Sequence, residues 1–184
     1  MRTSFFIAAA TTVALGTGAA MAQDNPTVGG AEMSAKLNIV ENAMNSPIHT
    51  TLVAAVQQAE LGDLLTGSGP FTVFAPTDEA FAALPEGTVE TLMMDENQEM
   101  LQTVLGCHVV EADAMSGAIA GMIADDGGAH PVPTVGGCTL TAEMSGDEIT
   151  LTDENGTVAT VIVADVEQSN GVIHVIDAVL TPPM

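Results

Sequence analysis

Two apolar segments with turn or cap residues at their ends constrain the fold of this chain more than any other feature. The first reads GPFTVFAPTDEAF and runs from Gly69 to Phe81, and the second reads SNGVIHVIDAVLTP and runs from Ser169 to Pro182. Both have the composition of short β-strands bounded by turn residues. In the first segment a proline ends the strand, and Thr77 is placed to cap a helix with an acidic first turn. The segments predict a strand that leads directly into a helix and a second, buried strand near the end of the chain.

Residues 1–22 have the pattern of an export signal. Arg2 provides a positive charge, residues 5–15 are mostly apolar, and residues 20–22 read Ala-Met-Ala, the small-residue pattern of a cleavage site. The apolar run is too short for a stable membrane anchor. We therefore expect a cleaved signal peptide, with an uncleaved anchor as the less favoured alternative. The mature protein is then periplasmic or extracellular (secreted), with no membrane span after signal cleavage.

The strongly acidic composition excludes nucleic acid as a partner. The chain has 24 Asp and Glu against two Lys and Arg, for a formal net charge of -22 at pH 7, and such a surface repels phosphate groups. The carboxylates form either a solvated surface, which we favour, or a surface for divalent cations or a basic partner. A sugar site built on aromatic stacking is also disfavoured, because the chain has no Trp or Tyr and the Phe residues beyond the signal all lie in the first segment.

Two cysteines, Cys107 and Cys138, are present in a chain that we expect to be exported. An oxidising compartment favours a disulfide between them. A redox or metal-binding pair is the alternative, but the cysteines lack the C-x-x-C spacing, and His108 beside Cys107 is weak support on its own. We therefore predict a structural disulfide.

In the first half of the chain the hydrophobic residues recur at helical spacing, and in the second half they alternate with polar residues as in β-strands. This change predicts an α+β fold. A polar, aperiodic stretch over 23–36 is expected to be a flexible leader, followed by a single domain over 37–184. Ser46 is placed to cap the second helix, and Gly146-Asp147 and Asn155-Gly156 are expected to form hairpin turns. The expected helices are 36–44, 48–59, 77–84, 88–93, 97–105 and 115–123, and the expected strands are 71–75, 107–110, 138–144, 149–151, 158–164 and 172–180.

The residues from Thr72 to Asp78, together with Phe81, resemble the first signature box of the fasciclin domain family. The residues from Asn170 to Asp177 resemble the second box, and Cys107-His108 stands where the family usually has Tyr-His. The resemblance implies a fasciclin-like β-sandwich or wedge with several helices packed along it. It also implies a role in adhesion or in binding an unknown protein or polysaccharide of the envelope or extracellular matrix. Cys107 departs from the family pattern, so a contact made through the tyrosine is not carried over.

The resemblance singles out eight motif residues, which we interpret as structural, with partner contact as the alternative: Thr77, Asp78, Phe81, His108, Asn170, Gly171, His174 and Asp177. His174 lies inside an apolar strand pattern and is expected to hydrogen-bond to backbone or a hydroxyl rather than act as a ligand or general base. Asp78 is expected at a helix start, and Asp177 is expected to hold a turn or contact a partner.

The remaining histidines and the acidic turn suggest no site. His49 at a helix start and His130 in a loop are expected to be exposed. Residues 153–156 contain two acids but lack the alternating ligands of an EF-hand, so they are interpreted as a hairpin turn. We predict no catalytic residue, metal ligand or cofactor. The favoured function is an exported, non-enzymatic interaction module, and the alternative is a periplasmic protein that binds a small molecule or metal ion.

Overall fold

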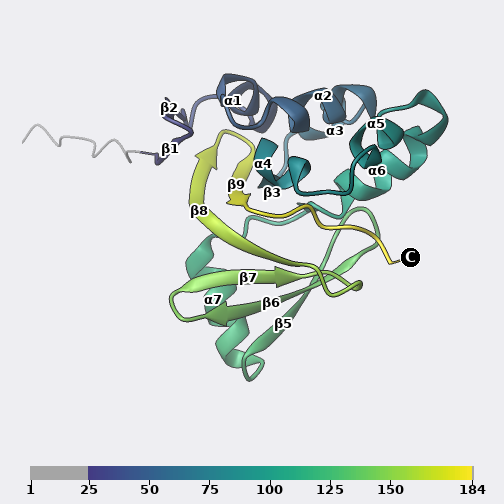
Figure 1. Ribbon diagram of the computed structural model, residues 1–184. Coiled ribbons are helices and arrows are strands. Elements are labelled where there is room, and N and C mark those ends of the chain that lie inside the picture. Colours follow the sequence, from purple (N-terminus) through teal and green to yellow (C-terminus); the bar gives the residue numbers. More distant parts are fainter. Residues whose placement is uncertain (1–24, 184) are drawn as a thin grey trace, which may run out of the picture.

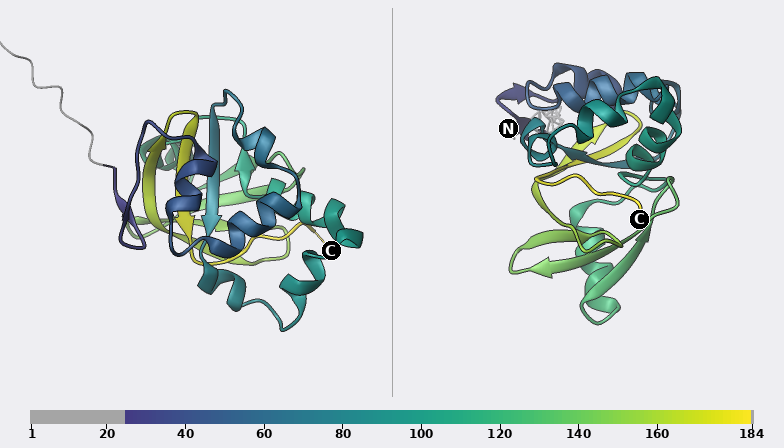
Figure 2. Two further views of the ribbon diagram at one scale, coloured as in Figure 1. Left: turned by 90° about the horizontal axis from the view of Figure 1, so that it is seen from above. Right: turned by 45° about the vertical axis from the view of Figure 1, so that its right-hand side comes forward.

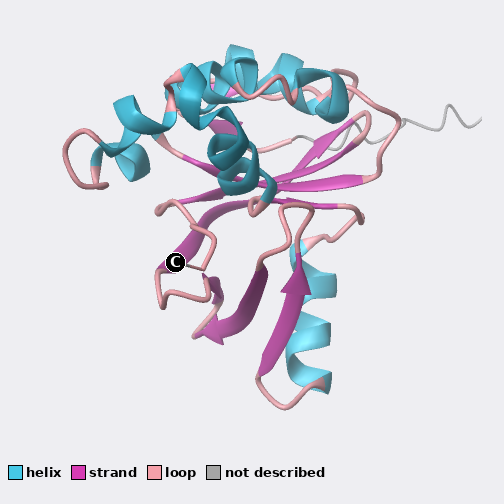
Figure 3. Cartoon of the chain, turned by 90° about the vertical axis from the view of Figure 1, so that its right-hand side faces the viewer, coloured by secondary structure: helices cyan, strands magenta, loops and turns pink. Residues whose placement is uncertain are grey.

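The computed structural model describes residues 25–183, and the predicted signal peptide lies outside the described residues. In this part of the chain a layer of short helices covers one end of a curved sheet, and one further helix packs near the other end (Figures 1 and 3). The helices are α1 (Ile39–Asn45), α2 (Thr50–Gln58), α3 (Gly62–Leu65), α4 (Asp78–Ala82), α5 (Thr88–Leu92), the 3-10 turn η1 (Asp95–Asn97), α6 (Gln98–Gly106) and α7 (Ser116–Asp125). This arrangement confirms the α+β class.

The main sheet has seven strands in the order β4-β3-β9-β8-β7-β6-β5. Its strands are β3 (Phe71–Pro76), β4 (Val109–Val110), β5 (Ala129–Pro133), β6 (Thr139–Ser145), β7 (Glu148–Thr152), β8 (Val158–Gln168) and β9 (Gly171–Ile176). The sheet curves strongly, as the views in Figure 2 show. Its two ends approach each other: in the loop after β5, the Val135 N–H donates to the carbonyl of Val109 in β4 at 2.8 Å.

The strands of the two apolar segments lie side by side in the main sheet, next to its edge strand β4. Strand β3 pairs with β9 in parallel, from Phe71 opposite Gly171 to Pro76 opposite Ile176, and every residue of β3 is buried. The pairing of β3 with β9 therefore joins two parts of the chain that are about 100 residues apart in sequence.

Two hydrophobic clusters form the core. Alternation along a strand sends neighbouring side chains to opposite faces of a sheet, so Val73 joins the cluster beneath the helical layer and Phe74 joins the other. The first cluster includes Leu52, Leu65, Leu105 and Ile173. The second lies between α7 and strands β5–β8 and includes Ile119, Leu140, Leu151 and Ile176.

Local cap chemistry places two of the helices. The Asn38 side chain accepts from the Glu41 N–H and the Glu41 carboxylate accepts from the Asn38 N–H, both at 2.9 Å, which is a complete capping box at the start of α1. Thr77 is the N-cap of α4, and its hydroxyl accepts from the Ala80 N–H at 3.2 Å. Strand β3 thus passes directly into α4, as the sequence predicts.

The N-terminal stretch differs from the flexible leader that was expected. Residues 27–32 form a hairpin of β1 (Thr27–Val28) and β2 (Ala31–Glu32), and Val28 and Met33 are buried in the first cluster. The Asn25 side chain also donates to the Glu167 carbonyl at 2.7 Å. These contacts, which a local pattern does not reveal, fix the stretch against the domain.

Several other elements also differ from expectation. Helix α2 begins at Thr50, so Ser46 is not its cap, and the strand expected over 107–110 is only β4. Strand β8 continues to Gln168, although its register with β9 shifts between Val161 and Val166, whereas β9 stops at Ile176. Strand β5 is not among the expected strands, because it contains Pro131 and Pro133, which a strand tolerates only at an edge such as this one.

Candidate functional site

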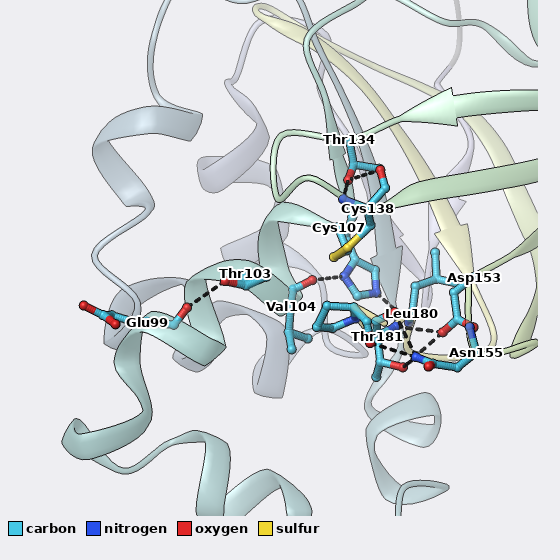
Figure 4. Close-up of a disulfide and its surroundings, with 12 residues drawn as sticks. Glu99, Thr103, Val104, Cys107, Thr134, Cys138, Asp153, Asn155, Leu180 and Thr181 are labelled. Carbon is cyan, nitrogen blue, oxygen red and sulfur yellow. Dashed lines mark hydrogen bonds between the residues drawn. A yellow bond between two sulfur atoms is a disulfide. The ribbon is translucent and has the colours of Figure 1, made fainter. Parts of the chain in front are cut away.

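The predicted disulfide is present and joins the end of α6 to the start of β6. Cys107 and Cys138 are both buried, with their Cα atoms 5.3 Å apart (Figure 4). Beside it the backbones of Gly106 and Gly136 meet so closely that a Cβ on Gly136 would lie 2.5 Å from the Thr103 carbonyl oxygen. The bond and this contact hold the β5–β6 loop against α6.

His108 bridges two backbone segments next to the disulfide. Its Nδ1–H donates to the Val104 carbonyl at 2.8 Å, and its Nε2 accepts from the Leu180 N–H at 2.9 Å. Burial lowers the pKa of His108 to about 4, against the raising effects of the Val104 carbonyl and the Asp153 carboxylate. The ring is therefore neutral near pH 7, and both nitrogens are occupied.

His174 makes the same kind of bridge with the other tautomer. Its Nε2–H donates to the Ala114 carbonyl at 2.7 Å, and its Nδ1 accepts from the Asp165 N–H at 3.2 Å. The ring is completely buried and stacks on Phe74 with the centroids 5.7 Å apart. Burial lowers the pKa of His174 despite the opposing effects of the Ala114 carbonyl and Asp165. A buried neutral imidazole with both nitrogens bonded has no free group for catalysis.

Both signature boxes hold the segment that leads into α7. The Thr72 hydroxyl donates to the Ala112 carbonyl at 2.7 Å and accepts from the Ala114 N–H at 2.9 Å. On β8, the Asp165 carboxylate accepts from the N–H and hydroxyl of Ser116 at the start of α7. Because His174 also bonds to Ala114, three separate strands fix this entry segment.

Asp78 occupies the first turn of α4 and also supports a different helix. Its carboxylate accepts from the Thr51 N–H at 2.8 Å and the Thr50 hydroxyl at 2.8 Å, at the start of α2. Helix α2 has no side-chain cap of its own. Burial raises the pKa of Asp78, but the hydrogen bonds from Thr51 and Thr50 outweigh it, so that the pKa lies below its usual range.

The second box begins with two residues that fit closely against other backbone. The Asn170 amide donates to the carbonyls of Leu65 and Gly67 at 2.7 and 2.9 Å, and its oxygen accepts from the Ile39 N–H at 3.1 Å. Gly171 has φ +157, and a Cβ there would lie 1.9 Å from the Phe71 carbonyl oxygen. Only glycine allows β9 to approach β3 at this point.

The other two motif residues have different surroundings. Phe81 is buried in the first core cluster. Asp177 is exposed just after β9, and its carboxylate accepts from the Thr160 N–H at 2.7 Å. Asp177 therefore joins the end of β9 to β8 while leaving part of its carboxylate accessible to solvent.

Asp153 is a buried anchor that sequence reasoning treated only as part of a turn. One oxygen accepts from the N–H groups of Asn155 and Thr157, and the other accepts from the N–H and hydroxyl of Thr181 (Figure 4). Burial raises the pKa of Asp153, but these hydrogen bonds outweigh it and hold the pKa below its usual range. An Asp that bonds two residues ahead is a local turn signal, whereas the contact with Thr181 has no local signal.

The two histidines expected to be exposed are not. His49 is buried beside α2, and its Nδ1 lies 2.7 Å from the Ser46 hydroxyl. Burial lowers the pKa of His49, although the Ala75 carbonyl and Asp78 raise it, and its Nε2 makes no hydrogen bond of normal geometry among the described residues. His130 is half-buried on β5 rather than in a loop, and its Nδ1 pairs with the Asp126 carboxylate.

An apolar cavity lies between the helical layer and the sheet. Its volume is about 120 Å³. The first box contributes Val73 and Ala75 to its wall, and the second contributes Ile173. The rest of the wall comes from α1, α2, α3, α6, β4, His108 and the β5–β6 loop. Sequence reasoning did not find this cavity, because its lining residues have the same spacing as ordinary core residues.

Within residues 25–183, no three His, Cys, Asp or Glu side chains are grouped as a metal site would require. None of the helices described is both long enough and apolar enough to cross a membrane.

Comparison with known proteins agrees with this architecture. The sequence model of the fasciclin domain matches residues 47–182. Protein sll1483 of Synechocystis sp. is 41% identical over 171 residues, which cover 88% of this chain and 83% of that protein. Immunogenic protein MPB70 of Mycobacterium bovis is 32% identical over 146 residues, which cover 77% of this chain and 67% of that protein.

A solved structure supports the same assignment. The chain is similar to the FAS1 domain pair from the insect cell adhesion molecule Fasciclin I, with a TM-score of 0.54 and 26% sequence identity, over 72% of this chain and 44% of that one. The match of the family model includes both boxes, the disulfide and the whole curved sheet. The chain belongs to the fasciclin domain family.

Proposed function

We propose that this protein is an exported, non-enzymatic interaction module that presents its surface to another protein or a polysaccharide of the envelope or extracellular matrix. The observation that carries the proposal is that the motif residues make hydrogen bonds that hold the fold together. Both ring nitrogens of His108 and His174 are bonded to backbone, and Thr77, Asp78 and Asn170 cap or join elements. The similarity to a domain pair from a cell adhesion molecule supports the same class of function.

The proposal is tested by measuring the binding of purified envelope proteins and polysaccharides to the immobilised protein at low and high salt. If high salt abolishes the capture, the acidic surface makes the contact, because salt screens exposed charges. If the capture persists at high salt, the contact is apolar. Asp177→Asn provides a matched variant, because asparagine keeps the oxygen that accepts from Thr160 but removes the exposed charge. A hydrolytic or redox activity that disappears in His174→Ala while the fold is retained would refute the proposal.

Binding of a small molecule is the second candidate, and the apolar cavity favours it. A metal-ion version of this candidate is tested by equilibrium dialysis against calcium, copper and zinc. Saturable uptake of one of these ions supports metal binding, and the absence of saturable uptake eliminates it.

A further inference from the structure

The cavity beneath the helical layer is of the right size for one small molecule. Its space of about 120 Å³ is close to that of an engineered protein cavity of about 150 Å³, which is lined by Leu, Ile and Phe, stays dry and binds benzene. The wall has the same chemistry, with residues such as Val56, Leu65, Leu105 and Ile173. Water gains few hydrogen bonds in such a space, whereas an apolar molecule gains contacts with the wall.

The lining of the cavity carries no charge. The chain has 24 acidic residues, yet none of them lines this cavity. Its polar lining side chains are mostly occupied: Gln102 donates to the Ala59 carbonyl at 2.8 Å, and both nitrogens of His108 are bonded. Gln57 is exposed and can meet a polar group at the edge. An anion inside would lose its water without gaining a partner and would also be repelled by the negatively charged protein.

Exposed apolar residues mark the mouth of the cavity. Leu64 on α3 is 38% exposed, and Val135 in the β5–β6 loop is 41% exposed, although both contribute to the lining. The loop that carries Val135 and Gly136 is held against α6 by the Cys107–Cys138 disulfide and by the close contact with Gly106. The disulfide therefore supports one wall of the cavity.

We infer that this cavity is a binding site for an uncharged apolar molecule of about benzene size, or for the apolar end of a larger uncharged molecule that enters past Leu64 and Val135. This inference rests on the second candidate function proposed above, binding of a small molecule, and does not depend on the surface interaction. A folded protein can bind the small molecule whether or not it binds a protein or polysaccharide partner.

The test uses fluorobenzene as the probe and 4-fluorobenzoate as its anionic counterpart, both followed by ¹⁹F NMR. We expect saturable line broadening with fluorobenzene and at least tenfold weaker binding of 4-fluorobenzoate. Nuclear Overhauser effects should connect the fluorobenzene protons to methyl groups of Val56 and Leu65. Absence of saturable broadening, or tighter binding of the benzoate, would overturn the inference.

A pair of variants locates the site. Ala43→Leu places a larger side chain into the wall on α1, and Ala54→Leu makes the same change on the exposed side of α2. We expect fluorobenzene affinity to fall at least tenfold in the first variant and to remain unchanged in the second. Equal binding by both variants would exclude this cavity. If Ala43→Leu fails to fold, the Overhauser contacts in the unmodified protein decide the question.

Discussion

The carboxylate of Asp165 on β8 accepts hydrogen bonds from both the backbone N–H (2.6 Å) and the hydroxyl (2.5 Å) of Ser116, the first residue of α7. Asp78 does the same for α2 through Thr50 and Thr51. Neither helix has a side-chain bond from its own N-cap residue. In both cases a carboxylate from a distant part of the chain accepts hydrogen bonds from N–H groups that have no partner within the helix. Its negative charge also interacts favourably with the positive end of the helix dipole.

Removing the distant cap of α7 should destabilise the protein. Asp165→Ala loses the charged acceptor and also places alanine at φ +57, so we expect a loss of about 2 kcal/mol in the free energy of unfolding. Asp165→Asn keeps an acceptor and tolerates this backbone conformation, so its loss should be smaller. Urea denaturation measures both, with Glu111→Ala on the exposed surface as the control. An unchanged stability of Asp165→Ala would contradict the capping role.

Acid should weaken the fold through Asp78 and Asp153. Both pKa values are below the ordinary value of 3.8 in the folded protein. Their stabilising contribution is therefore complete at pH values well above 3.8 and is lost as the pH falls through 3.8 towards the folded values. Unfolding midpoints in urea between pH 6 and pH 2 should show that the double variant Asp78→Asn, Asp153→Asn is less stable at pH 6 but loses less stability on acidification. Parallel curves for the two proteins would rule out this source of acid sensitivity.

His108 should make stability depend on pH in a higher range. Its pKa is about 4 when folded, against a usual value of 6.5, so the unfolded chain binds the proton more readily. Stability is therefore complete above pH 6.5 and falls as the pH drops towards 4, by about 2 kcal/mol between pH 7 and pH 5. Titration by ¹H NMR should show an imidazole that remains neutral at pH 5. A midpoint near 6.5 for the His108 ring would contradict this prediction.

The disulfide should be complete and strongly stabilising. Labelling of the native protein with a thiol reagent should detect no thiol, and reduction in denaturant should release two, since Cys107 and Cys138 are bonded. Replacing both cysteines with alanine opens a loop with a sequence separation of 31 and should cost about 3–4 kcal/mol by the chain-entropy relation. Thermal unfolding measures the cost, and a variant as stable as the parent would show that the bond is not structural.

Gly171 should be intolerant of any side chain. Gly171→Ala places a Cβ 1.9 Å from the Phe71 carbonyl oxygen, so we expect a loss of more than about 3 kcal/mol or a failure to fold. Gly117→Ala is the matched control, because its Cβ meets open space in α7 and should stabilise the helix by up to about 1 kcal/mol. Circular dichroism and urea denaturation distinguish the two, and equal stability would mean that β9 does not approach β3 this closely.

The features that sequence predicts here are those with local causes. Pro76 and Thr77 end a strand and begin a helix within a few residues, so the order of elements around the first box follows from sequence alone. The cap of Ser116 by Asp165 joins residues 49 positions apart, and no local pattern pairs them. His49 was expected to be exposed, yet it shares a small void with Val28 and Met33 of the N-terminal segment. That burial depends on a hairpin whose pattern is too short to predict.

The parallel pairing of β3 with β9 also determines when the domain can form. Strand β9 is synthesised after all the other strands of the main sheet, and it lies between β3 and β8, so these two strands cannot be joined in one sheet until residues 171–176 have left the ribosome. Contacts between residues as distant as Phe71 and Gly171 require closure of a long loop and slow the folding reaction. The main sheet of this domain should therefore assemble only after residues 171–176 have been synthesised, so that residues 71–76 wait without their parallel partner strand until then.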